Sequence, residues 1–180
     1  MCGRYEFKIG DGKKARQIKE RADKLGLVYK QGEIYPGDEV LCILPKQSGI
    51  DLKVMRWGIR SKSLLINARV ESLDERITFQ KIKDRRCAIV CNGFYEWDKA
   101  RNKYYIHFDD EIVYLACLYD ENEDLVILTR PADERLTAIH TRMPIVMDQK
   151  QMLNYVHNDG YEPCYDGLCF ERTDGAISLL

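Results

Sequence analysis

The sequence lacks three features that would settle its class at once. No apolar run approaches the roughly 18 residues that a membrane-spanning helix needs. The first residues contain no apolar signal-peptide core, so we expect a cytoplasmic protein. An excess of one charge is also missing, because 28 Lys and Arg residues face 29 Asp and Glu residues, for a net charge of -1. Proteins that coat nucleic acid non-specifically are usually strongly basic. Any contact with nucleic acid must therefore come from a local cluster of cations.

The sequence also has no internal repeat, no low-complexity tract and no linker rich in Pro, Gly or Ser. Its 180 residues are 45% hydrophobic and 32% charged, which is near normal for a soluble globular protein and excludes wholesale disorder. A chain of this length is one domain by the usual size rule. We therefore expect a single domain over residues 1–180, and a monomer.

Cysteine is present as an odd number of seven residues. Four of them lie inside apolar, strand-like runs, namely Cys42, Cys87, Cys91 and Cys117, and we expect these to be reduced core thiols. Cys87 and Cys91 are spaced C-x3-C, with no matching pair of Cys or His nearby. Because structural zinc sites need four ligands, we expect no metal site.

Helix signals are few. Apolar residues at helical spacing predict a helix from Asp11 to Gly26, with Asp11 as its cap. A capping box at Ser72–Glu75 predicts a short helix that ends near Lys83. Further short helices are expected over Ala132–Ala138 and from Asp148 onward, and the tail from residue 158 is left unassigned.

Strand signals dominate the chain and set the expected fold class. Many short runs are rich in β-branched or aromatic residues and are bounded by polar turns. The expected strands are Val40–Leu44, Leu52–Trp57, Cys87–Cys91, Tyr104–Phe108, Ile112–Leu118, Leu125–Thr129 and Pro144–Met147. Many strands with few helices predict an α+β fold or a partly closed barrel, and not a doubly wound βαβ array.

The most informative residue for chemistry is Cys2. If Met1 is removed, Cys2 becomes an N-terminal 1,2-aminothiol. An α-amino group has a pKa of about 7.7–8.0 and a thiol about 8.5, so both are partly nucleophilic near neutral pH. The amine can condense with an aldehyde to an imine, on which the thiol closes a five-membered thiazolidine ring. The alternative is a chance cysteine at a frayed terminus.

Three segments share one pattern, in which a chemically capable residue precedes an arginine by two positions. They are Cys2-Gly3-Arg4, Asn67-Ala68-Arg69 and His140-Thr141-Arg142. In extended chain, residues i and i+2 point to the same side, so each segment can present both groups to one cleft. Arginine binds phosphate oxygens bidentately, and three of them could hold a phosphodiester backbone. The alternative is three solvated surface arginines.

Two further residues are candidates for proton transfer. Glu96 is flanked by aromatic residues directly after a buried strand, which predicts partial desolvation and a raised carboxyl pKa suited to general acid/base work. The alternative is a strand-end carboxylate in water. Of the three histidines, His140 is best placed, between a predicted helix and a Pro-led strand. A lone histidine is nevertheless more often structural than catalytic.

Taken together, these segments resemble the SRAP family (SOS response-associated peptidases, also called abasic-site processing proteins). The matching pieces appear in the family's order over residues 1 to about 147: Met1-Cys2-Gly3-Arg4-Tyr5, Pro36-Gly37, Arg56-Trp57-Gly58, Asn67-Ala68-Arg69-Val70-Glu71-Ser72, Gly93-Phe94-Tyr95-Glu96-Trp97 and His140-Thr141-Arg142-Met143-Pro144. The resemblance implies an α+β domain with coiled sheets around a barrel-like core. It also implies binding of single-stranded DNA that carries an abasic site, with a thiazolidine crosslink that shields the lesion.

The resemblance implies catalytic roles for four residues. Cys2 is the nucleophile, exposed by autoproteolytic or aminopeptidase removal of Met1, so hydrolase and lyase-type activities are both implied. Asn67 orients the sugar oxygen near the new ring. Glu96 shuttles protons for Met1 removal, crosslinking and its reversal, and His140 protonates the sugar oxygen or assists the imine step. No metal or organic cofactor is implied.

The resemblance also implies a DNA-binding surface. Arg4, Arg69 and Arg142 would grip phosphates around the lesion, while Pro36 and Trp97 would stack on flanking bases. Trp97 is equally consistent with a core position. The chain departs from the family pattern in a shortened stretch from Ile59 to Ile66 and in its tail after residue 147. Both departures affect the expected DNA groove and leave the reactive residues in place.

Two rival functions stay open at this point. One is a Cys–His peptidase that acts on other proteins, because the residue types fit such a pair with an Asn or Glu partner. The other is a non-catalytic module that binds single-stranded nucleic acid. The first predicts cleavage of unrelated peptides, and the second predicts that Cys2→Ala leaves binding of abasic DNA unchanged.

Overall fold

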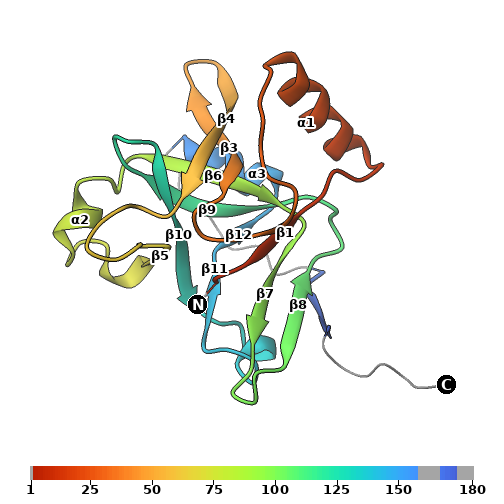
Figure 1. The fold of residues 1–180 in the computed structure, drawn as a ribbon, viewed down its shortest axis with the longest axis vertical. Helices are drawn as coiled ribbons and strands as arrows, with labels where there is room; N and C mark the ends of the chain where they lie inside the picture. Colours follow the sequence, from red (N-terminus) through yellow and green to blue (C-terminus); the bar gives the residue numbers. More distant parts are fainter. Residues whose placement is uncertain (1, 158–166, 174–180) are drawn as a thin grey trace.

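The computed structural model describes residues 2–157 and 167–173 of the chain (Figure 1). Within them it has two β-sheets of five and eight strands, together with three short α-helices. The predicted α+β class is therefore confirmed. The prediction of one domain over residues 1–180 stays a prediction.

Five strands of the larger sheet close into a barrel. They are β3 (Glu39–Lys46), β4 (Gly49–Trp57), β6 (Arg86–Cys91), β9 (Val113–Tyr119) and β10 (Asp124–Pro131). Neighbours pair in the order β4, β3, β6, β9, β10, and β10 returns to β4 in parallel. Leu125 of β10 closes the ring, because it pairs with Tyr119 of β9 and with Trp57 of β4. The predicted barrel-like core is confirmed.

Three short strands extend the barrel. β5 (Asn67–Arg69) runs parallel to β10, and β11 (Arg142–Pro144) runs antiparallel to it. β12 (Val146–Met147) pairs with β9. The predicted strand Pro144–Met147 is thus split between two partners. Ile145 bridges them, because its N–H donates to β10 and its carbonyl accepts from β9.

The smaller sheet carries the amino terminus to the motif around Glu96. Its strands are antiparallel, in the order β13 (Cys169–Arg172), β8 (Lys103–His107), β7 (Gly93–Trp97), β1 (Tyr5–Phe7) and β2 (Gly32–Ile34). β1 pairs with β7, and the N–H of Tyr95 donates to the Arg4 carbonyl at 2.8 Å. β7 also follows barrel strand β6 after a single residue, so the two sheets meet beside the start of the chain.

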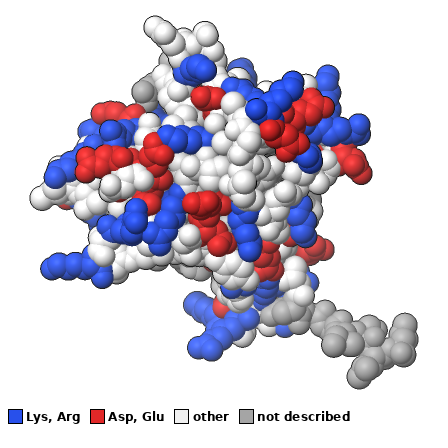
Figure 2. All heavy atoms as spheres, turned by 45° about the horizontal axis from the view of Figure 1, so that its top comes forward, with Lys and Arg blue, Asp and Glu red and all other residues white. Residues whose placement is uncertain are grey.

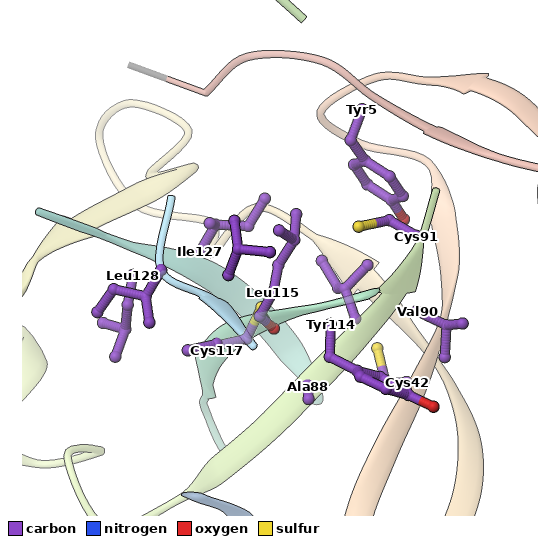
Figure 3. Packing of buried hydrophobic residues seen from close by; sticks show 14 of the residues in the cluster. Tyr5, Cys42, Ala88, Val90, Cys91, Tyr114, Leu115, Cys117, Ile127 and Leu128 are labelled. Carbon is purple, nitrogen blue, oxygen red and sulfur yellow. The ribbon is translucent and has the colours of Figure 1, made fainter. Parts of the chain in front are cut away.

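The barrel interior is apolar and contains thiols. Cys42, Cys87, Cys91 and Cys117 are all buried and free, which confirms the prediction of reduced core thiols. Figure 3 shows Tyr5 of β1 reaching down to Cys91 of β6, so the first strand contributes to this core. The described residues contain no group of three or more His, Cys, Asp or Glu side chains placed to hold a metal ion.

Helix α1 (Lys13–Lys24) lies where its periodicity predicts, but its predicted cap is wrong. The helix begins after Gly12 with no side-chain cap, and the Asp11 carbonyl accepts a 2.7 Å bond from Nε of Arg16 instead. Burial of Ala15 and Ala22 anchors it, and Gly26 at φ 65° follows its end. The described helices include none with the length and apolar character to cross a bilayer.

Predictions for the other helices meet with mixed success. Asp148 and Gln151 form a capping box that starts α3 (Gln149–Val156), as predicted. The box predicted at Ser72–Glu75 is wrong, because Ser72 belongs to the 3-10 turn η1 (Val70–Ser72) and its hydroxyl bonds the Arg69 carbonyl. The helix there is the single turn α2 (Ile77–Gln80). The helix predicted over Ala132–Ala138 is only the 3-10 turn η2 (Glu134–Leu136). The described part of the unassigned tail forms β13.

Candidate active site

Cys2 lies at the junction of the two sheets and is fully buried. Its thiol donates to the Arg4 carbonyl, with 3.7 Å between sulfur and oxygen. The first strand holds it there, because pairing of β1 with β7 begins only two residues later. The buried position shows that Cys2 does not lie in a frayed terminus.

Asn67 reaches Cys2 from the barrel side. Pairing of β5 with β10 sets Asn67 opposite Ile127. Its Nδ2 donates a 2.8 Å hydrogen bond to the Cys2 carbonyl. Its Oδ1 is buried and accepts no hydrogen bond from any described residue. One side-chain amide thus holds the reactive residue and keeps an acceptor in reserve, as a substrate hydroxyl would require.

Glu96 is the buried carboxyl of the site, with 5% of its surface exposed. Burial raises the pKa of Glu96 above its ordinary value, and the nearby positive charge of His140 lowers it in part. This confirms the desolvation predicted from the aromatic neighbours. A raised carboxyl pKa moves the group toward the range that general acid/base catalysis requires.

His140 lies across a small cavity from β7. The cavity is lined by Glu96, His140 and Arg142 together with apolar side chains. Nδ1 of His140 is 3.0 Å from the N–H nitrogen and 3.1 Å from the carbonyl oxygen of Arg142. The backbone therefore orients the ring in either tautomer. The structure thus brings together the four residues predicted to be catalytic, Cys2, Asn67, Glu96 and His140.

The environment of Cys2 disfavours its thiolate. Burial raises the pKa of the Cys2 thiol, and the negative charge of Glu96 raises it further. The thiol is therefore neutral at physiological pH. A nucleophilic role for this sulfur requires a base, and Glu96 is near enough to act on it electrostatically.

Arg4 is held in a stack of aromatic rings and is not free in this structure. Its guanidinium lies 4.3 Å from the ring centroid of Tyr35 and 5.0 Å from that of Trp97. Its Nη1 also pairs with Glu33 at 3.2 Å. Glu33 has a lowered pKa, mainly through its hydrogen bond from Lys103. DNA phosphate would have to compete with Glu33 for Arg4.

The three predicted phosphate-binding arginines differ in their surroundings. Arg142 pairs with Glu71 through both guanidinium Nη atoms, and its Nη2 donates to the Thr129 carbonyl at 2.7 Å. Arg142 is mostly buried, with 14% of its side chain exposed. Arg69 is exposed and forms no ion pair with any described residue. Of the three, Arg69 is the one available to a phosphate in this structure.

A tight turn over residues 35–38 lies beside Arg4. The N–H of Asp38 donates to the Tyr35 carbonyl at 3.0 Å, and Gly37 has a φ of 97° that favours glycine. Pro36 is half-buried in this turn. It directly follows Tyr35, whose ring contacts the Arg4 guanidinium.

Sequence reasoning missed the acidic partners Glu33 and Glu71. Glu71 lies two residues after Arg69, within the segment that was recognised, but only the fold shows that it reaches Arg142 on another strand. Glu33 carries no signal in the sequence, because it joins Arg4 through the pairing of β1 with β2. Figure 2 shows the same mixture on one whole face, where blue and red side chains alternate.

Comparison with known proteins settles the family. The family model of SOS response associated peptidase (SRAP) matches residues 1–169. The chain belongs to the SRAP family. The resemblance noted in the sequence is therefore confirmed, and the cluster around Cys2 is the part of this SRAP fold where its recognised segments meet.

Relatives and a solved structure agree with this placement. Abasic site processing protein YoqW of Bacillus subtilis is 27% identical over 162 residues, covering 78% of this chain and 72% of that protein. Abasic site processing protein YedK of Escherichia coli is 25% identical over 189 residues, covering 88% and 81%. A crystal structure of a Bordetella bronchiseptica protein superposes with a TM-score of 0.75 at 19% identity, covering 97% of this chain and 100% of the other. That structure shows the shared fold alone.

Proposed function

We propose that this SRAP protein captures abasic sites in single-stranded DNA through a covalent bond to Cys2. The names of its relatives support processing of abasic sites. The observation that carries the proposal is the buried position of Cys2, hydrogen-bonded by Asn67 and within the electrostatic reach of Glu96.

The reaction first requires a free amine on Cys2. The peptide bond between Met1 and Cys2 is hydrolysed, either by the site itself or by an aminopeptidase. One water is consumed, methionine leaves, and the new α-amine belongs to Cys2. In the self-processing route, Glu96 takes a proton from the attacking group and returns it to the leaving amine.

The amine then reacts with the ring-opened sugar. Its nitrogen attacks the C1′ carbonyl carbon, and one water leaves as the imine forms, with Glu96 and His140 moving the protons. The Cys2 sulfur adds to the imine carbon, while its proton passes to the ring nitrogen through Glu96. Because the thiol pKa is raised, the amine acts first and the sulfur second.

Confinement of the reacting groups in one pocket accounts for much of the expected crosslinking rate. The open-chain aldehyde is a minor form of the sugar, so an encounter in solution would rarely succeed. Holding amine, thiol and aldehyde in one pocket can contribute about 7–11 kcal/mol in well-oriented cases. The free Oδ1 of Asn67 orients a sugar hydroxyl beside the new ring. Every group in this scheme comes from the protein or from the DNA.

The DNA strand is held mainly from the Arg69 side. Arg69 contacts a backbone phosphate directly, because it is exposed and has no competing carboxylate in an ion pair. Arg4 and Arg142 contact phosphate by exchanging Glu33 and Glu71 for it. Pro36 and Trp97 border the strand and stack on flanking bases, at about 1–3 kcal/mol for each stacked base. The protein acts as a monomer in the cytoplasm.

A denaturing gel tests the proposal. Purified protein is mixed with a single-stranded oligonucleotide that carries one abasic site, and a band that survives denaturation is expected. The band must disappear with Cys2→Ala and with an oligonucleotide whose aldehyde has been reduced. Intact mass spectrometry of the reactive protein must show the loss of Met1. A band that persists when the Cys2 amine is blocked would overturn the proposal.

The same samples separate the rival functions. Binding that is non-covalent and unchanged by Cys2→Ala would favour a passive binding module. Cleavage of an unrelated peptide by mature protein, lost with Cys2→Ala, would favour a Cys–His peptidase. We expect neither result.

A further inference from the structure

A cavity of about 280 Å³ lies beside Asn67. Its lining includes Leu64 and Ile66 from the loop before β5, Asn67 and Arg69 from β5, and Arg76 and Phe79 at α2. It adjoins the candidate active site at Asn67, which belongs to both. Its volume is close to the lower end of ligand pockets, about 300 Å³, which suits one small unit and not a length of strand.

The shortened loop before β5 builds the apolar wall of this cavity. Ile59 and Leu65 exchange two backbone hydrogen bonds of 2.9 and 3.0 Å, which closes a tight hairpin. Gly58 permits it, because its φ is 120° and an added Cβ would lie 2.8 Å from Leu64. The hairpin places Leu64, with 40% of its surface exposed, on the cavity. Phe79 is buried and forms the floor.

Two cations edge the same cavity. Arg69 and Arg76 are both exposed, and neither forms an ion pair within the described ranges 2–157 and 167–173. This contrasts with Arg4 and Arg142, which both have carboxylate partners. Asn67 also lines this cavity, and its Oδ1 is buried. Two exposed guanidinium groups and an apolar wall match the phosphate and the base of a nucleotide.

We propose that this cavity holds the nucleotide directly adjacent to the abasic site, with its phosphate between Arg69 and Arg76 and its base against Leu64. The proposal rests on the proposed function, because it takes the lesion to lie over Cys2. It adds Arg76 as a second phosphate-binding residue and makes Leu64 a contact for the neighbouring base. Capture then depends on the nucleotide next to the lesion as well as on the lesion itself.

Salt dependence of binding tests the phosphate contact. The probe is a labelled single-stranded oligonucleotide with a tetrahydrofuran abasic analogue, which has no aldehyde and cannot form the crosslink. Each phosphate contact to a single strand adds about 0.7 to the slope of log affinity against log salt. Arg76→Ala is expected to reduce that slope by about 0.7. The backbone of Arg76 caps α2 through its carbonyl, which alanine retains, so the variant keeps its fold.

Lys81→Ala is the matched control. Lys81 directly follows the same helical turn, and its substitution also removes one positive charge. Lys81 borders a different cavity, together with Thr78 and Asp120. Its slope is expected to equal that of wild type. Equal slopes for the Arg76 and Lys81 variants would overturn the proposal. Leu64→Glu is a second probe, and it is expected to weaken binding without changing the melting temperature.

Truncated oligonucleotides locate the occupant. One probe lacks the nucleotide on the 5′ side of the analogue, and the other lacks it on the 3′ side. The difference between wild type and Arg76→Ala is expected to vanish on one of the two. A difference that persists on both would overturn the proposal. These measurements do not depend on crosslinking. If wild type forms the crosslink but Arg76→Ala has the same salt slope as wild type, the subsite alone is refuted. If Arg76→Ala reduces the salt slope as expected but wild type forms no crosslink, only the proposed function is refuted.

Discussion

The side-chain amide of Asn67 donates a 2.8 Å hydrogen bond to the main-chain carbonyl of Cys2. Asn67 starts a strand on the barrel, and Cys2 precedes the first strand of the smaller sheet. Chain ends usually fray unless they are tied down. This single bond ties the reactive residue to the barrel, so the position of Cys2 depends on a residue 65 positions away.

Asn67→Asp should slow crosslinking. A carboxylate has no N–H for the Cys2 carbonyl and adds a second negative charge near Glu96. A buried acceptor left without its donor costs about 1–3 kcal/mol, so we expect a rate reduced about tenfold or more. Single-turnover crosslinking rates on a gel measure this change. Asn67→Gln serves as a control, because it retains the amide donor on a longer side chain. An unchanged rate for Asn67→Asp would contradict the positioning role.

Glu96→Gln should raise the stability of the fold while it lowers the rate of crosslinking. Burial raises the pKa of Glu96, so its ionised form is disfavoured in the fold and the stability linked to this group is lost as pH rises through that pKa. Glutamine carries no charge. We therefore expect the variant to melt at a higher temperature than wild type near pH 8, with the gain shrinking below the ordinary glutamate pKa of 4.5.

The same variant should lose crosslinking rate across the pH range. General acid/base catalysis by one side chain typically contributes about 10²–10⁴-fold, so a loss within that range is expected. Thermal melts at pH 4 and pH 8 and crosslinking rates at the same pH values complete the test. A variant that is both slower and less stable at pH 8 would indicate a structural role for Glu96 instead.

Much of the barrel could be predicted from the sequence, because its strands are long apolar runs. The strands near Leu52–Trp57 and Cys87–Cys91 were predicted to within a few residues. β1 and β2 were missed, because strands of three residues have no periodicity to detect. The cap at Ser72 failed for another reason. Its hydroxyl satisfies a carbonyl inside a 3-10 turn, which a capping motif does not distinguish from a helix start.

The site was predictable where chemistry is carried by rare residue types in a recognisable order. Cys2, Asn67, Glu96 and His140 met as expected. The surroundings of the arginines were harder to predict. An i, i+2 pattern indicates which side of a strand a residue faces, but it does not indicate which carboxylate pairs with it. Glu71 binds Arg142 from the turn η1, and no local pattern encodes that pairing. The cavity at Arg76 depends on a hairpin that only the closed fold places beside Asn67.

Cys2 should be slow to alkylate in the native protein. Burial and the Glu96 charge raise the pKa of its thiol, so little thiolate is present at pH 8. Cys169 is exposed and should react first with iodoacetamide. Peptide mapping by mass spectrometry after timed alkylation measures both rates. Glu96→Gln removes one cause of the raised pKa and should speed labelling of Cys2, whereas equal rates for Cys2 and Cys169 would contradict this account.

Alanine substitution should lower stability at Arg142 and weaken DNA binding at Arg69. Arg142→Ala leaves the Thr129 carbonyl without its donor and Glu71 without its partner, at about 1–3 kcal/mol for a buried unsatisfied group. A clear drop in melting temperature is expected. Arg69→Ala touches an exposed side chain, so its stability should stay within about 0.5 kcal/mol of wild type. The slope of its DNA affinity against salt should fall by about 0.7.

Acid should erase the stability difference caused by Arg142→Ala. The hydrogen bond from Arg142 lowers the pKa of Glu71, so this pair stabilises the fold above the ordinary glutamate pKa of 4.5. The contribution is lost as pH falls through the lowered pKa, because Glu71 is then protonated. Urea unfolding of wild type and Arg142→Ala at pH 7 and pH 3 measures the change. A gap of the same size at both pH values would show that Arg142 stabilises the fold through Thr129 and packing, and not through Glu71.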